Sequence, residues 1–197
     1  MSRAIILLSG GLDSLVSLGL SEDVELALTF DYGQKAAQAE VSAAKKICEH
    51  YGVQHKVIKL DWLKEITTTA LVGTQEIQSG ANVWVPNRNG LFLNIAAAFA
   101  DSQGYERIII GANKEEAQTF PDNAREFIDR VNAEFEFSTL TKPKVEAPLI
   151  DLDKTEIVKI ALRKGIPLEL AQSCYNGTNC GICDSCVRFN NAKDFNN

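Results

Sequence analysis

The chain alternates short apolar runs with longer segments of helical periodicity, and this alternation constrains the fold more than any other feature. Short apolar or β-branched runs predict strands, whereas apolar residues that recur at helical spacing predict helices. The expected strands are residues 4–8, 24–30, 54–59, 107–110 and 144–147. The expected helices are residues 13–21, 34–51, 89–103, 121–137 and 153–164. Strands separated by helices pair in parallel, so the sequence predicts a three-layer α/β sandwich around a mostly parallel five-stranded sheet.

The length of 197 residues and the hydrophobic fraction of 45% suit a single domain spanning residues 1–197. No apolar run approaches the length that spans a bilayer, and the run that follows Met1-Ser2-Arg3 is too short for a signal peptide. We therefore expect a cytoplasmic protein without membrane contacts. Residues 61–88 lack regular periodicity and predict a long loop with room for one short helix, and a loop of this length is usually either functional or mobile.

A glycine-containing loop, Ser9-Gly-Gly-Leu-Asp-Ser14, follows the first expected strand and opens the first expected helix. Ligands of open α/β sheets bind at this edge, and the glycines let backbone N–H groups approach an anion closely. Ser9 and Ser14 can donate hydroxyl hydrogen bonds to phosphate. Asp13 would repel phosphate unless a cation lies between them, so we assign Asp13 to Mg²⁺. A tight turn with polar caps is the alternative, but the whole string favours phosphate binding.

Charge and cysteine content narrow the function further. The net charge of −6, without a run of basic residues, argues against direct nucleic-acid binding. Cys48 lies alone in a helical pattern and is expected in the core. The other four cysteines lie within thirteen residues: Cys174, Cys180, Cys183 and Cys186. Such crowding of cysteines favours a metal site. Four thiolates suit a structural Zn²⁺, which we expect on a C-terminal loop at about residues 173–190. An iron–sulfur cluster and free thiols are the alternatives.

The loop departs from the G-x-x-x-x-G-K-S/T loop of kinases and GTPases and resembles the PP-loop of ATP pyrophosphatases. Three further motifs follow it in order: F-D-Y-G-Q at residues 30–34, P-x-R-N at residues 86–89, and S-C-Y…C-G-x-C-x-S-C at residues 173–186. This order resembles the 7-cyano-7-deazaguanine synthase family over almost the whole chain. The cysteine string is the most discriminating part, because many PP-loop enzymes lack such a tail.

The resemblance implies a carbon–nitrogen ligase that cleaves ATP to AMP and pyrophosphate. In that family 7-carboxy-7-deazaguanine is adenylated, ammonia displaces AMP to give an amide, and a second adenylation converts the amide to the nitrile for queuosine or archaeosine. The expected partners are therefore a small deazapurine and ammonia, and we also expect a homodimer. ATP is expected to contact the loop and the preceding strand through Leu8, Ser9, Gly10, Gly11, Asp13 and Ser14.

Other candidates follow from their place at the ends of expected strands. Backbone groups at Phe30 could recognise adenine and Lys35 could contact phosphate, unless this segment is an ordinary turn. Arg88 is expected to bind the substrate carboxylate or a phosphate, whereas capping by Asn89 is the structural alternative. Asp13, Ser14 and Arg88 form the expected catalytic set.

Weaker candidates lie at the same edge, and their structural alternatives are strong. Gly111-Ala-Asn113 could contact the substrate or form a plain turn. Lys154 could neutralise pyrophosphate, although most lysines are solvated, and Asp122 is best explained as a charge at a helix N-terminus. Three other functions stay open: a PP-loop enzyme acting on a tRNA base, an adenylating enzyme for another acid or a protein terminus, and a non-catalytic nucleotide-binding module.

Overall fold

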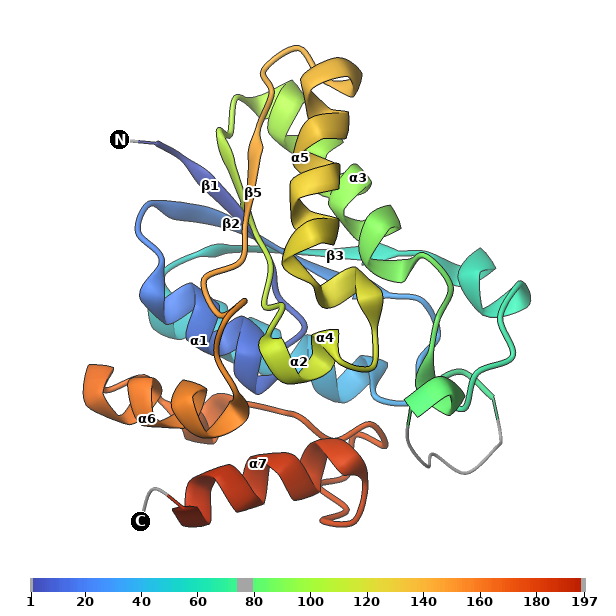
Figure 1. Ribbon diagram of the computed structural model, residues 1–197, viewed down its shortest axis with the longest axis vertical. Helices are drawn as coiled ribbons and strands as arrows, with labels where there is room; N and C mark the ends of the chain where they lie inside the picture. The colour runs from blue at the N-terminus through green and yellow to red at the C-terminus, as the bar shows by residue number, and fades with distance from the viewer. Residues whose placement is uncertain (1, 74–79, 196–197) are drawn as a thin grey trace.

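A computed structural model describes residues 2–73 and 80–195. The five strands pair in parallel in the order β3-β2-β1-β4-β5. They are β1 (Ala4–Leu7), β2 (Val24–Asp31), β3 (Gln54–Lys59), β4 (Arg107–Ile109) and β5 (Lys144–Glu146). The α-helices are α1 (Leu12–Leu20), α2 (Ala37–Tyr51), α3 (Arg88–Gln103), α4 (Lys114–Ala117), α5 (Arg125–Ser138), α6 (Lys154–Lys164) and α7 (Asp184–Phe195). The predicted sandwich with its parallel five-stranded sheet is confirmed (Figure 1).

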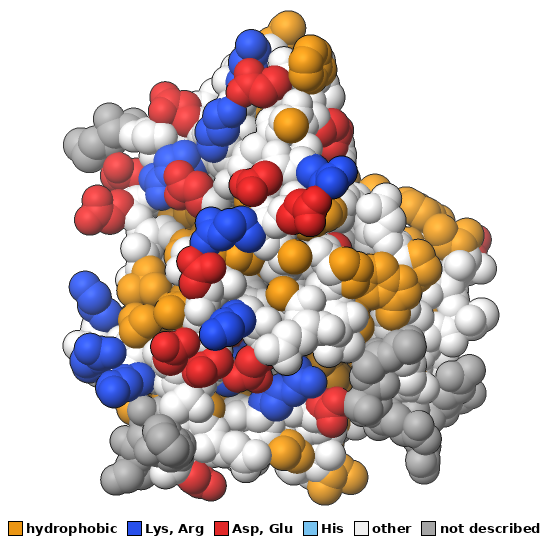
Figure 2. Space-filling view, viewed as in Figure 1, with side chains coloured by type: hydrophobic (Ala, Val, Ile, Leu, Met, Phe, Trp, Pro, Cys, Tyr) orange, Lys and Arg blue, Asp and Glu red, His pale blue; other side chains and the backbone are white. Residues whose placement is uncertain are grey.

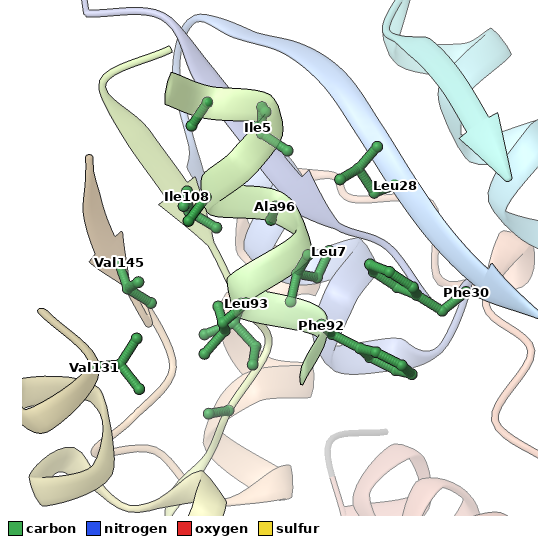
Figure 3. Packing of buried hydrophobic residues seen from close by; sticks show 14 of the residues in the cluster. Ile5, Leu7, Leu28, Phe30, Phe92, Leu93, Ala96, Ile108, Val131 and Val145 are labelled. Atoms are coloured by element: carbon green, nitrogen blue, oxygen red, sulfur yellow. The ribbon is translucent and has the colours of Figure 1, made fainter. Parts of the chain in front are cut away.

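Alternation along the central strand β1 produces the layers, because successive side chains of a strand point to opposite faces. Ile5 and Leu7 belong to a core cluster with α3 and α5, where Phe92, Leu93 and Ala96 of α3 face the sheet (Figure 3). Ala4, Ile6 and Leu8 belong to a second cluster with α1, α2 and α6. All four residues of β1 are buried, which explains why its sequence is a continuous apolar run rather than an alternating one.

Several helix ends were predicted correctly from local chemistry. Gly52 and Gly165 end α2 and α6 in the left-handed conformation. Asp153 and Glu156 form a reciprocal capping box at the start of α6. Cys48 is buried on α2, as expected.

Other boundaries differ from the prediction. The helix expected from residue 34 begins at Ala37, since the Gln34 side chain instead hydrogen-bonds the backbone of the turn before it. The helix expected from residue 121 begins as a 3-10 turn, Pro121–Asn123, and α5 starts at Arg125. The expected loop of residues 61–88 contains the 3-10 turns Asp61–Glu65 and Gly80–Val83, and its residues 74–79 lie outside the described residues.

Two helices were not predicted. The four-residue α4 follows β4, and α7 packs against α6 at the bottom of Figure 1. The sequence predicts that the cysteine segment is a loop alone, and this is wrong. Because α7 contains Cys186, the segment is a loop joined to a helix. Within the described part of the chain, no helix combines the length and the hydropathy that crossing a bilayer would require.

Candidate functional site

The Ser9–Ser14 loop lies where the strand order reverses. β1 has β2 on one side and β4 on the other, and ligands of open α/β sheets bind at such switch points. Gly10 has a φ of +80°, and a Cβ on it would lie 2.7 Å from the Glu40 carbonyl oxygen. A Cβ on Gly111, just beyond β4, would lie 2.9 Å from the Ser14 backbone nitrogen. Glycine at both positions therefore lets α2 and the end of β4 approach the loop closely.

The hydroxyl groups of the loop gather at the N-terminus of α1. The Ser9 Oγ accepts a hydrogen bond from the Gly11 N–H at 3.2 Å and lies 3.2 Å from the Ser14 Oγ. The Ser14 hydroxyl donates to the Gly11 carbonyl at 3.0 Å. The N-cap residue of α1 is Gly11, which has no side chain to cap the helix, so the N-terminal dipole and these two hydroxyls form an anion-binding arrangement.

Two residues just before the cysteine segment, Gln172 and Ser173, hydrogen-bond this loop. The Leu12 N–H donates to the Ser173 hydroxyl at 3.2 Å, and the Gln172 N–H donates to the Gly10 carbonyl at 2.8 Å. Ser173 immediately precedes Cys174, so the cysteine segment is attached to the candidate phosphate loop by direct hydrogen bonds.

A buried ion-pair network adjoins the loop. Lys154, at the start of α6, pairs with the Asp13 carboxylate and lies 3.1 Å from the Glu116 carboxylate of α4. Burial raises the pKa of Asp13 to about 6 against the opposing pull of Lys154, and the two carboxylates together raise the pKa of Lys154 despite its burial. The other carboxylate oxygen of Asp13, Oδ1, is buried without a hydrogen-bond partner among the described residues. That orphaned oxygen fits a cation ligand, which is the role predicted for Asp13.

A cavity of about 220 Å³ opens beside the loop. The predicted residues that line it are Leu8, Ser9, Gly11, Asp13, Ser14, Phe30 and Arg88, together with Gly111 and Asp122 of the weaker candidates. Gly10 and Lys35 are not among the described residues that line it. Gly10 packs against α2 instead of facing the cavity. Lys35 is exposed, and its backbone N–H donates to the Leu71 carbonyl at 2.8 Å. The phosphate-binding role of Lys35 stays a prediction that the cavity does not favour.

Aromatic rings form part of the cavity wall. Phe30 and Phe92 stack with centroids 4.0 Å apart, and Trp84 and Phe120 stack at 5.8 Å. All four rings line the cavity. Flat apolar walls of this kind suit the faces of a purine or deazapurine ring.

Arg88 begins α3 and is partly buried in the cavity wall. Burial opposes its charge, but a hydrogen bond to Tyr32 and the negative field of Asp122 and Glu116 hold the pKa of Arg88 above its ordinary value. The preceding residue, Asn87, has a φ of +55°, which asparagine tolerates better than most residues. Arg88 is thus a fixed cation facing the cavity, which suits the predicted contact with a carboxylate or phosphate.

The four clustered cysteines, Cys174, Cys180, Cys183 and Cys186, lie close enough to share one ion. Their sulfur atoms all lie within 4.8 Å of one another. Tetrahedral thiolate coordination of Zn²⁺ places sulfurs about 3.8 Å apart, so the group fits a single ion. Burial disfavours the Cys174 thiolate, but N–H groups of Cys180, Thr178 and Asn176 outweigh burial and lower the pKa of Cys174 to about 6. Burial raises the pKa of Cys183 and Cys186 in the absence of an ion, so it is the softness of four sulfur donors that favours a thiophilic metal.

The structure also places residues in the site that the sequence analysis did not single out: Tyr32, Glu40, Phe92, Glu116, Ser173, Tyr175 and Ser185. Ser173, Tyr175 and Ser185 each adjoin a cysteine of the cluster, and Tyr32 belongs to the F-D-Y-G-Q motif, so proximity to a motif was an available signal for these. Glu40 and Glu116 had no comparable local signal.

The sheet order, the serine- and glycine-containing loop at the switch point and the adjoining cavity define a nucleotide-binding α/β protein of the PP-loop type. Two solved structures share the fold. One is the U34-tRNA thiolase NcsA from Methanococcus maripaludis with its 4Fe–4S cluster. It has a TM-score of 0.53 at 16% identity, and the match covers 84% of this chain and 57% of the thiolase chain. The other is NMN synthetase from Francisella tularensis. It has a TM-score of 0.55 at 19% identity, and the match covers 98% of this chain and 76% of the synthetase chain.

Sequence comparison identifies the family. The family model described as queuosine biosynthesis protein QueC matches residues 3–196. The 7-cyano-7-deazaguanine synthase of Methanosarcina mazei is 48% identical over 94% of this chain and 91% of the relative. That of Carboxydothermus hydrogenoformans is 47% identical over 100% of both chains. The chain therefore belongs to the QueC family.

Proposed function

We propose that this protein is an ATP-dependent ligase that converts 7-carboxy-7-deazaguanine and ammonia to 7-cyano-7-deazaguanine for queuosine or archaeosine synthesis. The cavity beside the Ser9–Ser14 loop carries the proposal, because it joins an anion-binding helix N-terminus to stacked aromatic rings and a fixed arginine. Relatives bearing the name of this activity support it.

A carboxylate is a poor acyl donor, and transfer of AMP to its oxygen creates a good leaving group. In this scheme the α1 N-terminus with Ser9 and Ser14 binds the phosphates. Arg88 holds the substrate carboxylate before adenylation, and Leu8 and Phe30 contact the nucleotide. Because the protein must mainly position reactants and neutralise charge, fixed donors and cations are the groups that the reaction needs.

Two metals belong to the proposal. Asp13 would hold Mg²⁺ through its unpartnered oxygen, and the ion would neutralise charge on the phosphates. The four clustered cysteines would hold Zn²⁺ with no open position, which makes the ion structural. We further propose that the protein acts in the cytoplasm as a homodimer and does not bind nucleic acid directly. The net charge of −6 supports the last point; in Figure 2 basic and acidic side chains alternate over α5, whereas basic side chains gather over α6.

An adenylating enzyme for a tRNA base, another acid or a protein terminus is the alternative, since it would use the same loop. The deciding experiment incubates the protein with ATP, Mg²⁺, ammonium and 7-carboxy-7-deazaguanine and identifies the products by mass spectrometry. We expect the nitrile together with AMP and pyrophosphate. Release of ADP and phosphate would refute the PP-loop assignment, whereas AMP formation only with another acid would redirect the substrate assignment.

A further inference from the structure

The proposed reaction requires a proton acceptor. The nitrile nitrogen carries no hydrogen, so every proton that ammonia brings must leave during the two rounds of adenylation. A carboxylate close to the adenylated carbon can accept such protons if it is not already neutralised by a cation. Among residues 2–73 and 80–195, four carboxylates line the cavity, and they are Asp13, Glu40, Glu116 and Asp122.

Ion pairing separates these four groups. Asp13 and Glu116 share the ammonium group of Lys154, so each of these carboxylates already has a cationic partner. Asp122, in the 3-10 turn Pro121–Asn123, accepts a hydrogen bond from its neighbour Asn123 at 3.2 Å and, like Glu40, takes part in no ion pair among the described residues. Glu40 forms no ion pair within the described ranges 2–73 and 80–195, and its backbone carbonyl abuts Gly10 of the loop.

The position of Glu40 is fixed by a neutral group. The Gln34 Nε2 donates to the Glu40 Oε2 at 2.7 Å and to the Phe30 carbonyl at 3.0 Å. The Gln34 Oε1 accepts from the Tyr32 N–H at 2.9 Å, which determines which end of the amide faces Glu40. An amide donor orients a carboxylate without cancelling its charge, so Glu40 keeps its capacity to accept a proton.

Resting on the proposed function, we propose that Glu40 is the general base that removes protons from the nitrogen supplied by ammonia. In the first round, ammonia forms a C–N bond with the acyl carbon, Glu40 accepts a proton from that nitrogen, and the C–O bond breaks with its electron pair leaving on AMP. In the second round, the amide oxygen attacks the α-phosphorus and pyrophosphate leaves. The two remaining N–H protons are then lost in turn to Glu40, which returns each proton to solvent, as AMP departs and C≡N forms.

The surroundings of Glu40 suit this work. Burial raises the pKa of its carboxyl group, while the Gln34 hydrogen bond and the nearby Arg88 oppose the rise and Asp31 adds to it. A base is most effective when its pKa lies near the working pH, and the shift is in that direction.

Glu40→Gln provides the test, because glutamine keeps the shape and loses the base. ATP–pyrophosphate exchange with 7-carboxy-7-deazaguanine measures adenylation alone, and mass spectrometry at saturating ammonium measures amide and nitrile formation. We expect the variant to retain exchange and its melting temperature while amide formation falls by about 100- to 10,000-fold, a typical contribution of a general base. Glu40→Asp should recover part of the loss, and the acidic limb of the pH–rate profile should disappear in Glu40→Gln.

The matched control is Glu49→Gln on the same helix, where the exposed carboxylate pairs with Lys45 and both reactions should stay normal. Parallel loss of exchange and amide formation in Glu40→Gln would overturn the assignment, as would normal amide formation. Selective loss of amide formation in Asp122→Asn but not in Glu40→Gln would assign the base to Asp122. Failure of the unaltered protein to exchange pyrophosphate with this acid would refute the proposed function itself, and the role of Glu40 with it.

Discussion

Lys154→Met should lower the free energy of unfolding, because it removes the only cation of the Asp13–Lys154–Glu116 network described beside the loop. The Lys154 side chain is 10% exposed, and the paired side chains of Asp13 and Glu116 are 16% and 28% exposed. Methionine preserves the length of the side chain but removes the ammonium group, so two carboxylates would face each other without a cation.

Removing one partner of a buried pair typically costs about 3–5 kcal/mol, since the remaining charge is left uncompensated. For a protein of this size about 1 kcal/mol shifts the melting temperature by about 2–4 °C, so we expect a fall of about 6–20 °C at neutral pH. Glu116→Gln in the same chain should restore part of the stability, because one of the two unpaired charges disappears. Lys159→Met, at an exposed position on the same helix, should change stability by less than about 0.5 kcal/mol.

The loss should depend on pH in a defined direction. Burial already raises the pKa of Asp13 to about 6, and Lys154 opposes that rise, so its removal raises the pKa further. A group whose pKa is higher in the folded state favours folding at low pH and disfavours it as the pH rises through that value. Urea unfolding should therefore show a smaller deficit at about pH 5 than at about pH 8. Equal deficits at both pH values, or no deficit at all, would refute the reasoning.

Three further predictions concern the metal, the loop and its aspartate. Elemental analysis should find one zinc per chain, lost when any of the four clustered cysteines becomes serine but kept in Cys48→Ser; stoichiometric iron with visible absorbance would mean a cluster instead. Gly10→Ala should lower the unfolding free energy by about 1–3 kcal/mol more than Gly52→Ala, because both have positive φ but only the Gly10 position is crowded; equal melting temperatures would contradict this. Asp13→Asn should slow AMP formation by about a thousandfold, or about 4 kcal/mol, and near-normal turnover would reduce Asp13 to a structural role.

The sheet, its parallel pairing and most helix ends could be predicted because each rests on a local signal. Apolar periodicity located the strands, and glycine or a capping box located helix ends such as those of α2 and α6. The phosphate loop was predictable for the same reason, because Ser9 to Ser14 form one continuous string. Its partner Ser173 lies 161 positions from Leu12, and no local pattern specifies that hydrogen bond.

The failures have physical causes as well. The α7 helix carries two adjacent asparagines, Asn190 and Asn191, and few apolar residues, so it lacks the amphipathic pattern that predicts a helix. Its order comes from packing on α6 and from the cysteine cluster. Glu116 and Glu40 resemble ordinary helical surface residues in sequence, and tertiary placement alone brings them to the cavity.

The hydrogen bonds between residues 172–173 and the loop after β1 link the folding of the phosphate site to the docking of the C-terminal segment. Ser173 and Gln172 hydrogen-bond the loop after β1, so the candidate phosphate site is complete only when the last segment has docked. Closing a loop between residues this far apart costs conformational entropy, which the contacts of the docked segment must offset. A metal bound by the four clustered cysteines would order the segment that supplies these contacts, since metal binding and local folding share one free energy. The cysteine cluster would therefore act on nucleotide affinity through Ser173 without touching the nucleotide.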